Sequence, residues 1–299
     1  GKDVFVGGIL EHIEMAGIHS GDSACCTPPF SLSLSLQGQL RDIARRLALR
    51  LGVVGLLNIQ FAIKDQVIYV IEANPRASRT VPFVSKSTGV PLAKIAARIM
   101  AGEKLADLHL PADDREFDYF CVKEAVMPFG RFPGSDVVLG PEMKSTGEVM
   151  GIAGNFPAAF TKTQLAIDYE PPRGGEVFIS VNDGDKRNIT AIARSIARLG
   201  FSLVATTGTA RALRASGIEC EEVGKIHAGS HTILDRIASG EIVLMINTPF
   251  GSSTNTDGYE MRAACVRHGV SYCTTLAGAQ ALIAGMEAVR ETGLDVIAL

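Results

Sequence analysis

Apolar residues follow two different rhythms along the chain, and the first covers its N-terminal third. Residues 4–102 alternate as a strand, a loop with Pro28 and Pro29, a helix, a hairpin and a further helix. The first helix is predicted to start from a Ser35 cap. Its apolar residues recur at helical spacing and are Leu40, Ile43, Ala44, Leu47, Ala48 and Leu51. This part of the chain is therefore predicted to form a mixed α/β layer.

The middle of the chain is less regular. Residues 117–132 include one strand-like run, and residues 139–154 form a glycine-rich connection, so we expect a lid or a bridge. The adjacent prolines and glycines of "DYEPPRGGE", residues 168–176, then predict a linker.

A regular alternation of strand and helix begins at Glu176. Short β-branched runs are separated by helical patterns, and they occupy residues 176–183, 201–208, 219–224, 242–248 and 270–275. One helix follows Asp185 and ends at Gly200, and a last helix is expected from Ala277 to Glu291. This rhythm predicts an α/β fold with a parallel sheet and helices on its faces.

Length and composition restrict the function without naming it. The 299 residues predict two domains, and with 46% hydrophobic residues, 20% charged residues and a net charge of -3 we expect no nucleic acid or membrane partner. The six cysteines show no paired spacing, and no signal peptide or apolar run of about 18 residues occurs, so we expect a cytoplasmic protein. The chain opens on Gly1, which suggests a piece of a longer protein.

Polar side chains interrupt the apolar hairpin "NIQFAIKDQVIYVIEANPRASRT", residues 58–80. Glu72 and Asn74 are two positions apart and share one face of their strand. Gln60 lies on that face only if the residue numbers of directly opposite partners add up to an even number. This condition requires a loop with an odd number of residues around Asp65 and Gln66, and we expect such a loop. A two-residue turn would place Gln60 on the opposite face.

One carboxylate and two amides on a common face form an oxygen donor set that suits magnesium. So few protein ligands indicate that the oxygens of a nucleotide complete the metal shell. Arg76 and Arg79 follow, and guanidinium groups there can clamp a phosphoryl group or a carboxylate-like acceptor. The spacing alone is equally compatible with a buried ion pair between Glu72 and the arginines.

A second polar set is predicted at the carboxyl edge of the parallel sheet. Thr206, Gly208 and Thr209 stand where a strand ends and a helix begins, which favours a phosphate. Lys186, Lys225 and Asn247 follow other strands and are expected at the same edge. The alternative is a threonine-rich helix cap with solvated lysines.

Three stretches carry a resemblance that covers essentially all 299 residues: "LLNIQFAIKDQVIYVIEANPRASRTVPFVSKSTGVPLAKIAARIMAG", "EHIEMAGIHSGDS" and "LGPEMKSTGEVMG". They resemble the second synthetase unit of carbamoyl-phosphate synthase large subunits. The resemblance implies part of an ATP-grasp α+β domain (1–103), a bridging segment (104–172) and a Rossmann-like, methylglyoxal-synthase-like allosteric domain (173–299).

The resemblance also implies an activity, the ATP-dependent phosphorylation of carbamate to carbamoyl phosphate for pyrimidine and arginine biosynthesis, with a glutaminase small subunit as partner. By this likeness Gln60, Glu72 and Asn74 bind Mg²⁺ or Mn²⁺ that bridges ATP phosphates, and Arg76 and Arg79 hold the acceptor. Nucleotide-binding residues are Gly17, Ile18, His19 and Ser20 together with Gln60 and Glu72. The family's flexible loop and adenine contacts would precede Gly1, so the isolated chain is expected to be inactive.

Effector sites are implied in the same way. UMP or IMP would be held by Ser180, Lys186, Thr206, Thr209, Lys225, Asn247 and Thr248. Ornithine would be held by Glu14, Asp22, Glu124 and Thr274. The chain departs from the enterobacterial pattern at "PFGSS", where Ser252 and Ser253 replace an expected basic pair.

Other functions stay open on the sequence. They are a purely regulatory nucleotide-binding module and another ATP-grasp ligase such as a biotin carboxylase. An active methylglyoxal synthase is disfavoured, because that chemistry needs a carboxylate at the site and Asn247 and Thr248 bring none.

Overall fold

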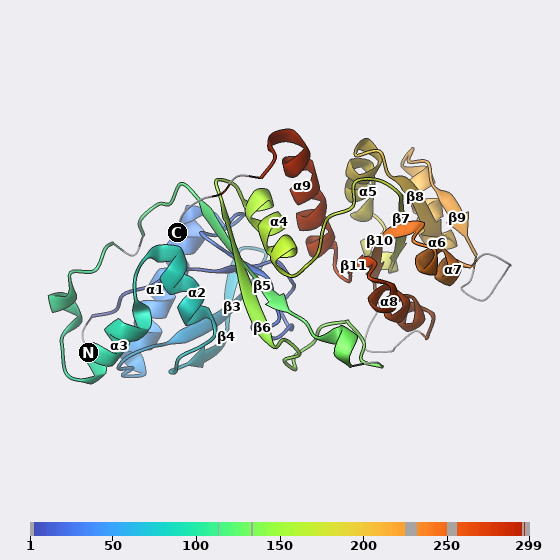
Figure 1. The fold of residues 1–299 in the computed structure, drawn as a ribbon. Coiled ribbons are helices and arrows are strands. Elements are labelled where there is room, and N and C mark those ends of the chain that lie inside the picture. The colour runs from blue at the N-terminus through green and yellow to red at the C-terminus, as the bar shows by residue number, and fades with distance from the viewer. Residues whose placement is uncertain are drawn as a thin grey trace.

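The computed structural model describes residues 3–112, 114–132, 134–224, 232–249, 256–294 and 296. Two α/β halves follow one another along the chain, and the C-terminal helix α9 (Leu276–Thr292) returns to pack on α4 (Phe156–Ala166) of the first half (Figure 1). Among the described residues, no helix is both long and apolar enough to cross a membrane.

The first half is built on a four-stranded antiparallel sheet in the order β1-β2-β5-β6. Its strands are β1 (Glu11–His12), β2 (Cys25–Thr27), β5 (Phe120–Val126) and β6 (Gly147–Ala153). The other elements of this half are α1 (Leu34–Arg50), β3 (Asn58–Lys64), β4 (Val67–Asn74), α2 (Thr80–Thr88), α3 (Leu92–Met100), η1 (Leu105–Leu108) and η2 (Phe129–Arg131). Ser33, and not the predicted Ser35, caps α1, since its Oγ accepts the N–H of Leu36 at 3.3 Å.

The middle of the chain is more regular than its sequence indicates, because it holds β5, β6 and α4. Glycines conceal β6, since they weaken the strand pattern. A Cβ atom at Gly151 would lie 2.2 Å from the carbonyl oxygen of Ala159 in α4. Only glycine therefore allows the helix to approach this strand so closely.

The β3–β4 hairpin corrects the predicted loop. Asp65 and Gln66 form a two-residue turn, both with positive φ (50° and 65°), and Lys64 pairs with Val67. The expected odd-numbered loop is thus wrong. The register changes further along, because Phe61 pairs with Val70 whereas Gln60 pairs with Glu72, so the intervening residue, Ile71, is a β-bulge.

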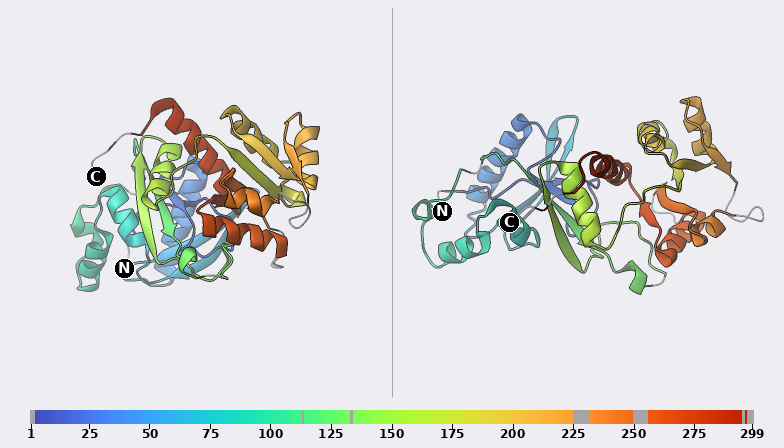
Figure 2. Two further views of the ribbon diagram at one scale, coloured as in Figure 1. Left: turned by 45° about the vertical axis from the view of Figure 1, so that its right-hand side comes forward. Right: turned by 45° about the horizontal axis from the view of Figure 1, so that its top comes forward.

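The second half confirms the predicted parallel sheet, with strand order β11-β10-β7-β8-β9. Two further views of the ribbon show this half beside the first (Figure 2). Its strands are β7 (Glu176–Val181), β8 (Ser202–Thr206), β9 (Glu221–Val223), β10 (Ile242–Thr248) and β11 (Ser271–Cys273). Its other elements are η3 (Asp183–Asp185), α5 (Ile189–Arg198), α6 (Thr207–Ala215), α7 (Ile233–Ala238) and α8 (Thr256–His268), besides α9.

Alternate strand residues face different helices. Val177 and Ile179 pack in one core cluster with residues of α5 and α9, whereas Phe178 packs in another with residues of α7 and α8. The first cluster also contains Ile13 and Phe160 from the N-terminal half. A single apolar core therefore runs across the boundary between the two halves.

The contact between α9 and α4 depends on Gly285. A Cβ there would lie 2.3 Å from Thr161 Oγ1, and Thr161 is buried with its hydroxyl bonded to the Pro157 carbonyl. We expect Gly285→Ala to destabilise the chain by about 1–3 kcal/mol, because the two helices must separate. Denaturant unfolding of the 299-residue chain measures this.

Gly38→Ala is the matched control, because that helical glycine has nothing within 4 Å of its added Cβ. It should be neutral or stabilise by about 0.5–1 kcal/mol. Equal stability of the Gly285→Ala variant and the wild type would contradict the close packing of α9 on α4.

Candidate functional site

The bulge at Ile71 brings the polar side chains of the hairpin to one face. Gln60 lies directly opposite Glu72, and Asn58 lies opposite Asn74, so all four side chains share a face. The amide nitrogen of Asn74 donates to Glu72 Oε1 at 2.8 Å. The sequence analysis missed Asn58. The available signal was its spacing, since Asn58 lies two positions before Gln60 on the same strand and therefore shares its face.

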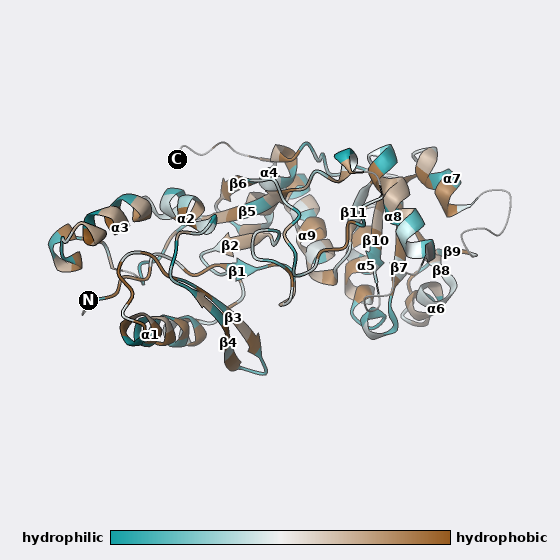
Figure 3. Ribbon diagram, turned by 90° about the horizontal axis from the view of Figure 1, so that it is seen from below, coloured by the Kyte–Doolittle hydropathy of each residue, from teal (hydrophilic) through white to brown (hydrophobic). Residues whose placement is uncertain are grey.

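This polar face is open. Glu72 is exposed, while Gln60 and Asn74 are half-buried. Elsewhere β4 is apolar and also exposed: Val67, Tyr69 and Ile71 keep 50%, 53% and 54% of their surface (Figure 3). Within β4 the polar positions are thus confined to the end that leads to Pro75.

The arginines after the hairpin do not neutralise Glu72. Arg76 donates to the carbonyl of Ala77 at 3.0 Å, and Arg79 Nη1 donates to Ser145 Oγ at 3.1 Å. Within the part of the chain that the structure describes, neither guanidinium is ion-paired with Glu72, so the buried ion pair that the spacing also allowed is not formed. The charge of Glu72 remains available to a cation.

The donor set fits a hard divalent cation. It offers one carboxylate and three amide oxygens, which are the ligand types that such ions take. Among the described residues, no cluster of three or more His, Cys, Asp or Glu side chains could hold a metal. A cation bound at this face would therefore need further oxygens from water or from a phosphate.

The segment expected near the nucleotide, Gly17 to Ser20, lies beside residues 140–143. The N–H of His19 donates to the Gly140 carbonyl at 2.8 Å, and His19 Nδ1 accepts the N–H of Gly21 at 3.0 Å. His19 thus uses Nδ1 to shape its own loop, which leaves Nε2 as the nitrogen that can meet a ligand.

Two half-buried carboxylates lie close together between the halves. Glu14 Oε2 accepts the N–H of Ala24 at 2.7 Å, and Glu124 Oε2 accepts the amide of Gln164 at 3.0 Å. Burial, and then the charge of Glu124, raise the pKa of Glu14, while burial raises the pKa of Glu124. Both charges also act on Cys273, which precedes Thr274. The pair is suited to a cationic ligand, whose charge would favour both ionised forms.

Asp22 is used differently from these two carboxylates. It is 1% exposed, and its oxygens accept the backbone N–H groups of Lys144 and Ser145 at 2.7 and 2.9 Å. The carboxylate predicted to bind ornithine therefore holds a segment of the chain in place.

Hydroxyl and amide groups gather at the carboxyl edge of the parallel sheet. Thr206 Oγ1 lies 3.4 Å from Ser180 Oγ and 3.3 Å from Thr209 Oγ1. Asn247 donates to the Ser180 carbonyl at 3.1 Å, and Thr248 Oγ1 accepts the N–H of Asn182 at 3.1 Å.

Lys186 brings a positive charge to this edge. Its Nζ is ion-paired with Asp183 and lies 2.9 Å from where a Cβ of Gly208 would be, at the start of α6. The predicted residues Lys225, Ser252 and Ser253 lie outside the described residues. The described edge combines hydroxyls, an ammonium group and a helix start, which suits a phosphate.

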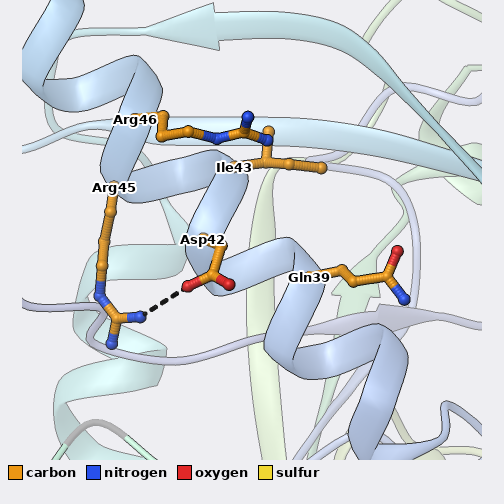
Figure 4. A pocket seen from close by; sticks show the side chains of 5 residues that line it. All are labelled: Gln39, Asp42, Ile43, Arg45 and Arg46. Carbon is orange, nitrogen blue, oxygen red and sulfur yellow. Dashed lines mark hydrogen bonds and ion pairs between the residues drawn. The ribbon is translucent and has the colours of Figure 1, made fainter.

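A separate hollow of about 560 Å³ lies on α1. Gln39, Asp42, Ile43, Arg45 and Arg46 line it, all from one helix, and Arg45 pairs with Asp42 at 3.2 Å (Figure 4). It contains none of the predicted site residues and is an open helix surface, so the chemistry is better located by the donor groups of the hairpin.

Two family models match the chain. Residues 4–108 match the carbamoyl-phosphate synthase L chain, ATP binding domain, and residues 188–274 match the MGS-like domain. The first match includes the polar hairpin. The second includes Thr206, Thr209, Asn247 and Thr248 of the carboxyl edge and begins after Ser180 and Lys186.

Similar proteins are the carbamoyl phosphate synthase large chains of Methanothermobacter thermautotrophicus (52% identical over 302 residues), Myxococcus xanthus (50% over 293) and Archaeoglobus fulgidus (53% over 297). The alignments cover 100%, 98% and 99% of this chain but only 28%, 27% and 28% of these relatives. The chain therefore spans little more than a quarter of their length.

The Glu14–Glu124 pair predicts a dependence of stability on pH. The raised pKa values mean that the folded chain holds protons that the unfolded chain loses, so stability falls as pH rises from the ordinary glutamate value to the raised one. His12, whose pKa burial and then Lys123 lower to about 4, acts oppositely, but only below its ordinary value of 6.5. Between pH 6.5 and about 8 the carboxylates should dominate.

We expect the melting temperature of the wild-type chain to fall across this range and that of Glu14→Gln to fall less. Glu116→Gln, at an exposed carboxylate, should follow the wild type. If the melting temperature of Glu14→Gln falls with pH as steeply as that of the wild type, the carboxylate pair does not retain protons in the folded chain.

Proposed function

We propose that this chain, which is 52% identical to a carbamoyl phosphate synthase large chain and spans about 28% of its length, supplies the metal-binding face of an ATP site and the regulatory domain of such an enzyme. The reaction is the transfer of the γ-phosphoryl group of ATP to carbamate, which forms carbamoyl phosphate and ADP. The observation that carries the proposal is the direct pairing of Gln60 with Glu72, flanked by Asn58 and Asn74.

In this function Gln60, Glu72 and Asn74 would hold Mg²⁺ or Mn²⁺ next to the nucleotide phosphates. The ion would neutralise the charge that builds on the phosphoryl oxygens. An oxygen of carbamate attacks the γ-phosphorus as the bond to ADP breaks, so the acceptor must be aligned with that bond. Arg79 is suited to orient the carbamate, because its hydrogen-bond partner Ser145 is neutral and, among the residues that the structure describes, no carboxylate is ion-paired with the guanidinium.

Further parts of the proposal rest on the family alone. The ATP-grasp architecture includes a flexible loop over the phosphates and contacts to adenine that this chain does not contain, so we propose that the isolated chain is inactive. We likewise propose that a glutaminase small subunit supplies ammonia to the complete enzyme.

Glu72→Gln tests the catalytic proposal in the complete enzyme. The substitution keeps the size of the side chain and removes the charge that holds the metal, so carbamoyl phosphate formation should fall by about 100-fold or more. The assay is the formation of carbamoyl phosphate with saturating ATP and ammonia.

Glu103→Gln is the control, since Glu103 is an exposed carboxylate that pairs with Arg98, five residues earlier, at 2.6 Å. It should retain wild-type activity. Full activity of Glu72→Gln would refute the assignment of Glu72.

We propose that the C-terminal half binds a nucleoside monophosphate such as UMP or IMP, and that the Glu14–Glu124 pair binds ornithine. The hydroxyls of Ser180, Thr206 and Thr209 and the start of α6 support the nucleotide site. Lys186 would exchange its contact with Asp183 for a phosphate oxygen.

Calorimetric titration of the 299-residue chain tests this binding. Lys186→Ala should weaken UMP or IMP by about 10-fold, because one charge-assisted hydrogen bond is lost. Arg187→Ala, at the exposed neighbouring residue, should leave the affinity unchanged. The regulatory assignment fails if neither nucleotide binds saturably to the wild type.

A further inference from the structure

One segment, Asp136 to Ser145, is anchored in both halves of the chain, and we call it the connecting segment. It lies between η2, which packs near α8 of the C-terminal half, and β6 of the N-terminal sheet. One end bonds directly to Arg79, and the other end reaches Asn247 through Arg262.

At the C-terminal half the anchor is Arg262 of α8, which is only 3% exposed. Its Nε and Nη2 atoms donate to the two carboxylate oxygens of Asp136 at 2.8 and 2.5 Å, and Nη1 donates to Asn247 Oδ1 at 2.7 Å. Gly258 makes room, since a Cβ there would lie 2.9 Å from Nη1. One guanidinium therefore joins the connecting segment to the edge of the parallel sheet.

The Arg262–Asp136 pair is held tightly. Burial alone would raise the pKa of Asp136, but the hydrogen bonds and charge of Arg262 outweigh it and lower that pKa. A bidentate pair with little exposure is strongly directional, and removal of one partner leaves a costly unpaired charge.

Within the connecting segment, the side chain of Lys144 bonds back to the first residues of the segment. Its ammonium group donates to the carbonyls of Asp136 and Val138 at 2.9 and 2.8 Å, and the N–H of Val138 donates to Asp136 Oδ1 at 3.2 Å. Asp136 is therefore linked to Lys144 by direct hydrogen bonds.

At the N-terminal half the segment ends on Arg79. Asp22 accepts the N–H groups of Lys144 and Ser145, and Ser145 Oγ donates to the Gly21 carbonyl at 3.2 Å. The same hydroxyl accepts Arg79 Nη1 at 3.1 Å. Continuous polar contacts thus lead from Asn247 through Arg262, Asp136, Lys144 and Ser145 to Arg79.

We propose that Ser145 is a positioning residue for Arg79, and that the Arg262–Asp136 pair sets the position of Ser145 according to whether an anion occupies the edge at Asn247. The physical reason is competition for one guanidinium: a phosphate near Asn247 attracts Arg262 and weakens its hold on Asp136. Such a ligand shifts the connecting segment only because it interacts differently with the paired and unpaired states. The linkage rests on the proposed nucleotide site, and its effect on catalysis rests in addition on the proposed reaction.

Hydrogen–deuterium exchange on the 299-residue chain tests the linkage without any enzyme assay. In the wild type, saturating UMP or IMP should change the protection of the Lys144 and Ser145 amides. In Asp136→Asn the nucleotide should still bind within about threefold of the wild-type affinity, but the change in protection should be lost. Arg262→Lys keeps the positive charge but cannot donate the two parallel hydrogen bonds to Asp136, so it should behave in the same way. Asp42→Asn, at an exposed carboxylate paired with Arg45, should match the wild type.

Kinetics of the complete enzyme test the consequence. Asp136→Asn should reduce the effect of the nucleotide on kcat/KM by about fivefold or more. Ser145→Ala should lower kcat by about 10-fold with an unchanged KM for ATP, and Ser145→Thr, which keeps the hydroxyl, should restore most of the rate.

An Asp136→Asn variant with wild-type protection changes and wild-type nucleotide response would overturn the linkage. A Ser145→Ala variant with wild-type kcat would overturn the positioning role. If the complete wild-type enzyme forms no carbamoyl phosphate while the amides of Lys144 and Ser145 still respond to nucleotide, the proposed function fails and the linkage stands.

Discussion

The β-bulge at Ile71 is the constraint on which the candidate catalytic site depends. A two-residue turn at Asp65 and Gln66 starts the hairpin in a register that would put Glu72 on the face opposite to Gln60. The extra residue shifts the register of β4 by one position, so the carboxylate of Glu72 comes to the same face as the amide of Gln60. A bulge next to a functional site commonly serves to redirect a side chain in this way.

The arginines show how the fold separates structural charge from reactive charge. Arg262 is buried and neutralised by Asp136, and Arg236 is buried beside Glu176 and Glu221. Arg79, in contrast, is exposed and bonded to a neutral hydroxyl. A guanidinium that is oriented by a neutral group keeps its charge for an anionic substrate, which is what the acceptor side of a phosphoryl transfer requires.

The sequence predicted the parts of the fold that follow from periodicity. The five parallel strands, α5 and α9 stand out because buried β-branched runs and a regular helical stripe determine them locally. β6 was missed because Gly151 serves the packing of α4, a tertiary requirement that strand propensity does not reveal. The bulge was missed for a similar reason, since nothing in the strand pattern marks Ile71 as the unpaired residue. The sequence analysis correctly stated which register puts Gln60 on the face of Glu72. It expected the turn to set that register, whereas the bulge in β4 sets it. The link from Asn247 to Arg79 joins residues far apart in the chain, and only the folded structure brings them together.

The most direct measurement is an anomalous difference map at the manganese edge from crystals of the complete enzyme with Mn²⁺ and ADP. Manganese bonded to both Gln60 Oε1 and a carboxylate oxygen of Glu72 is the result that the shared face predicts. Manganese bound to the nucleotide but away from these two side chains, or Gln60 and Glu72 on opposite faces of the hairpin, would contradict it.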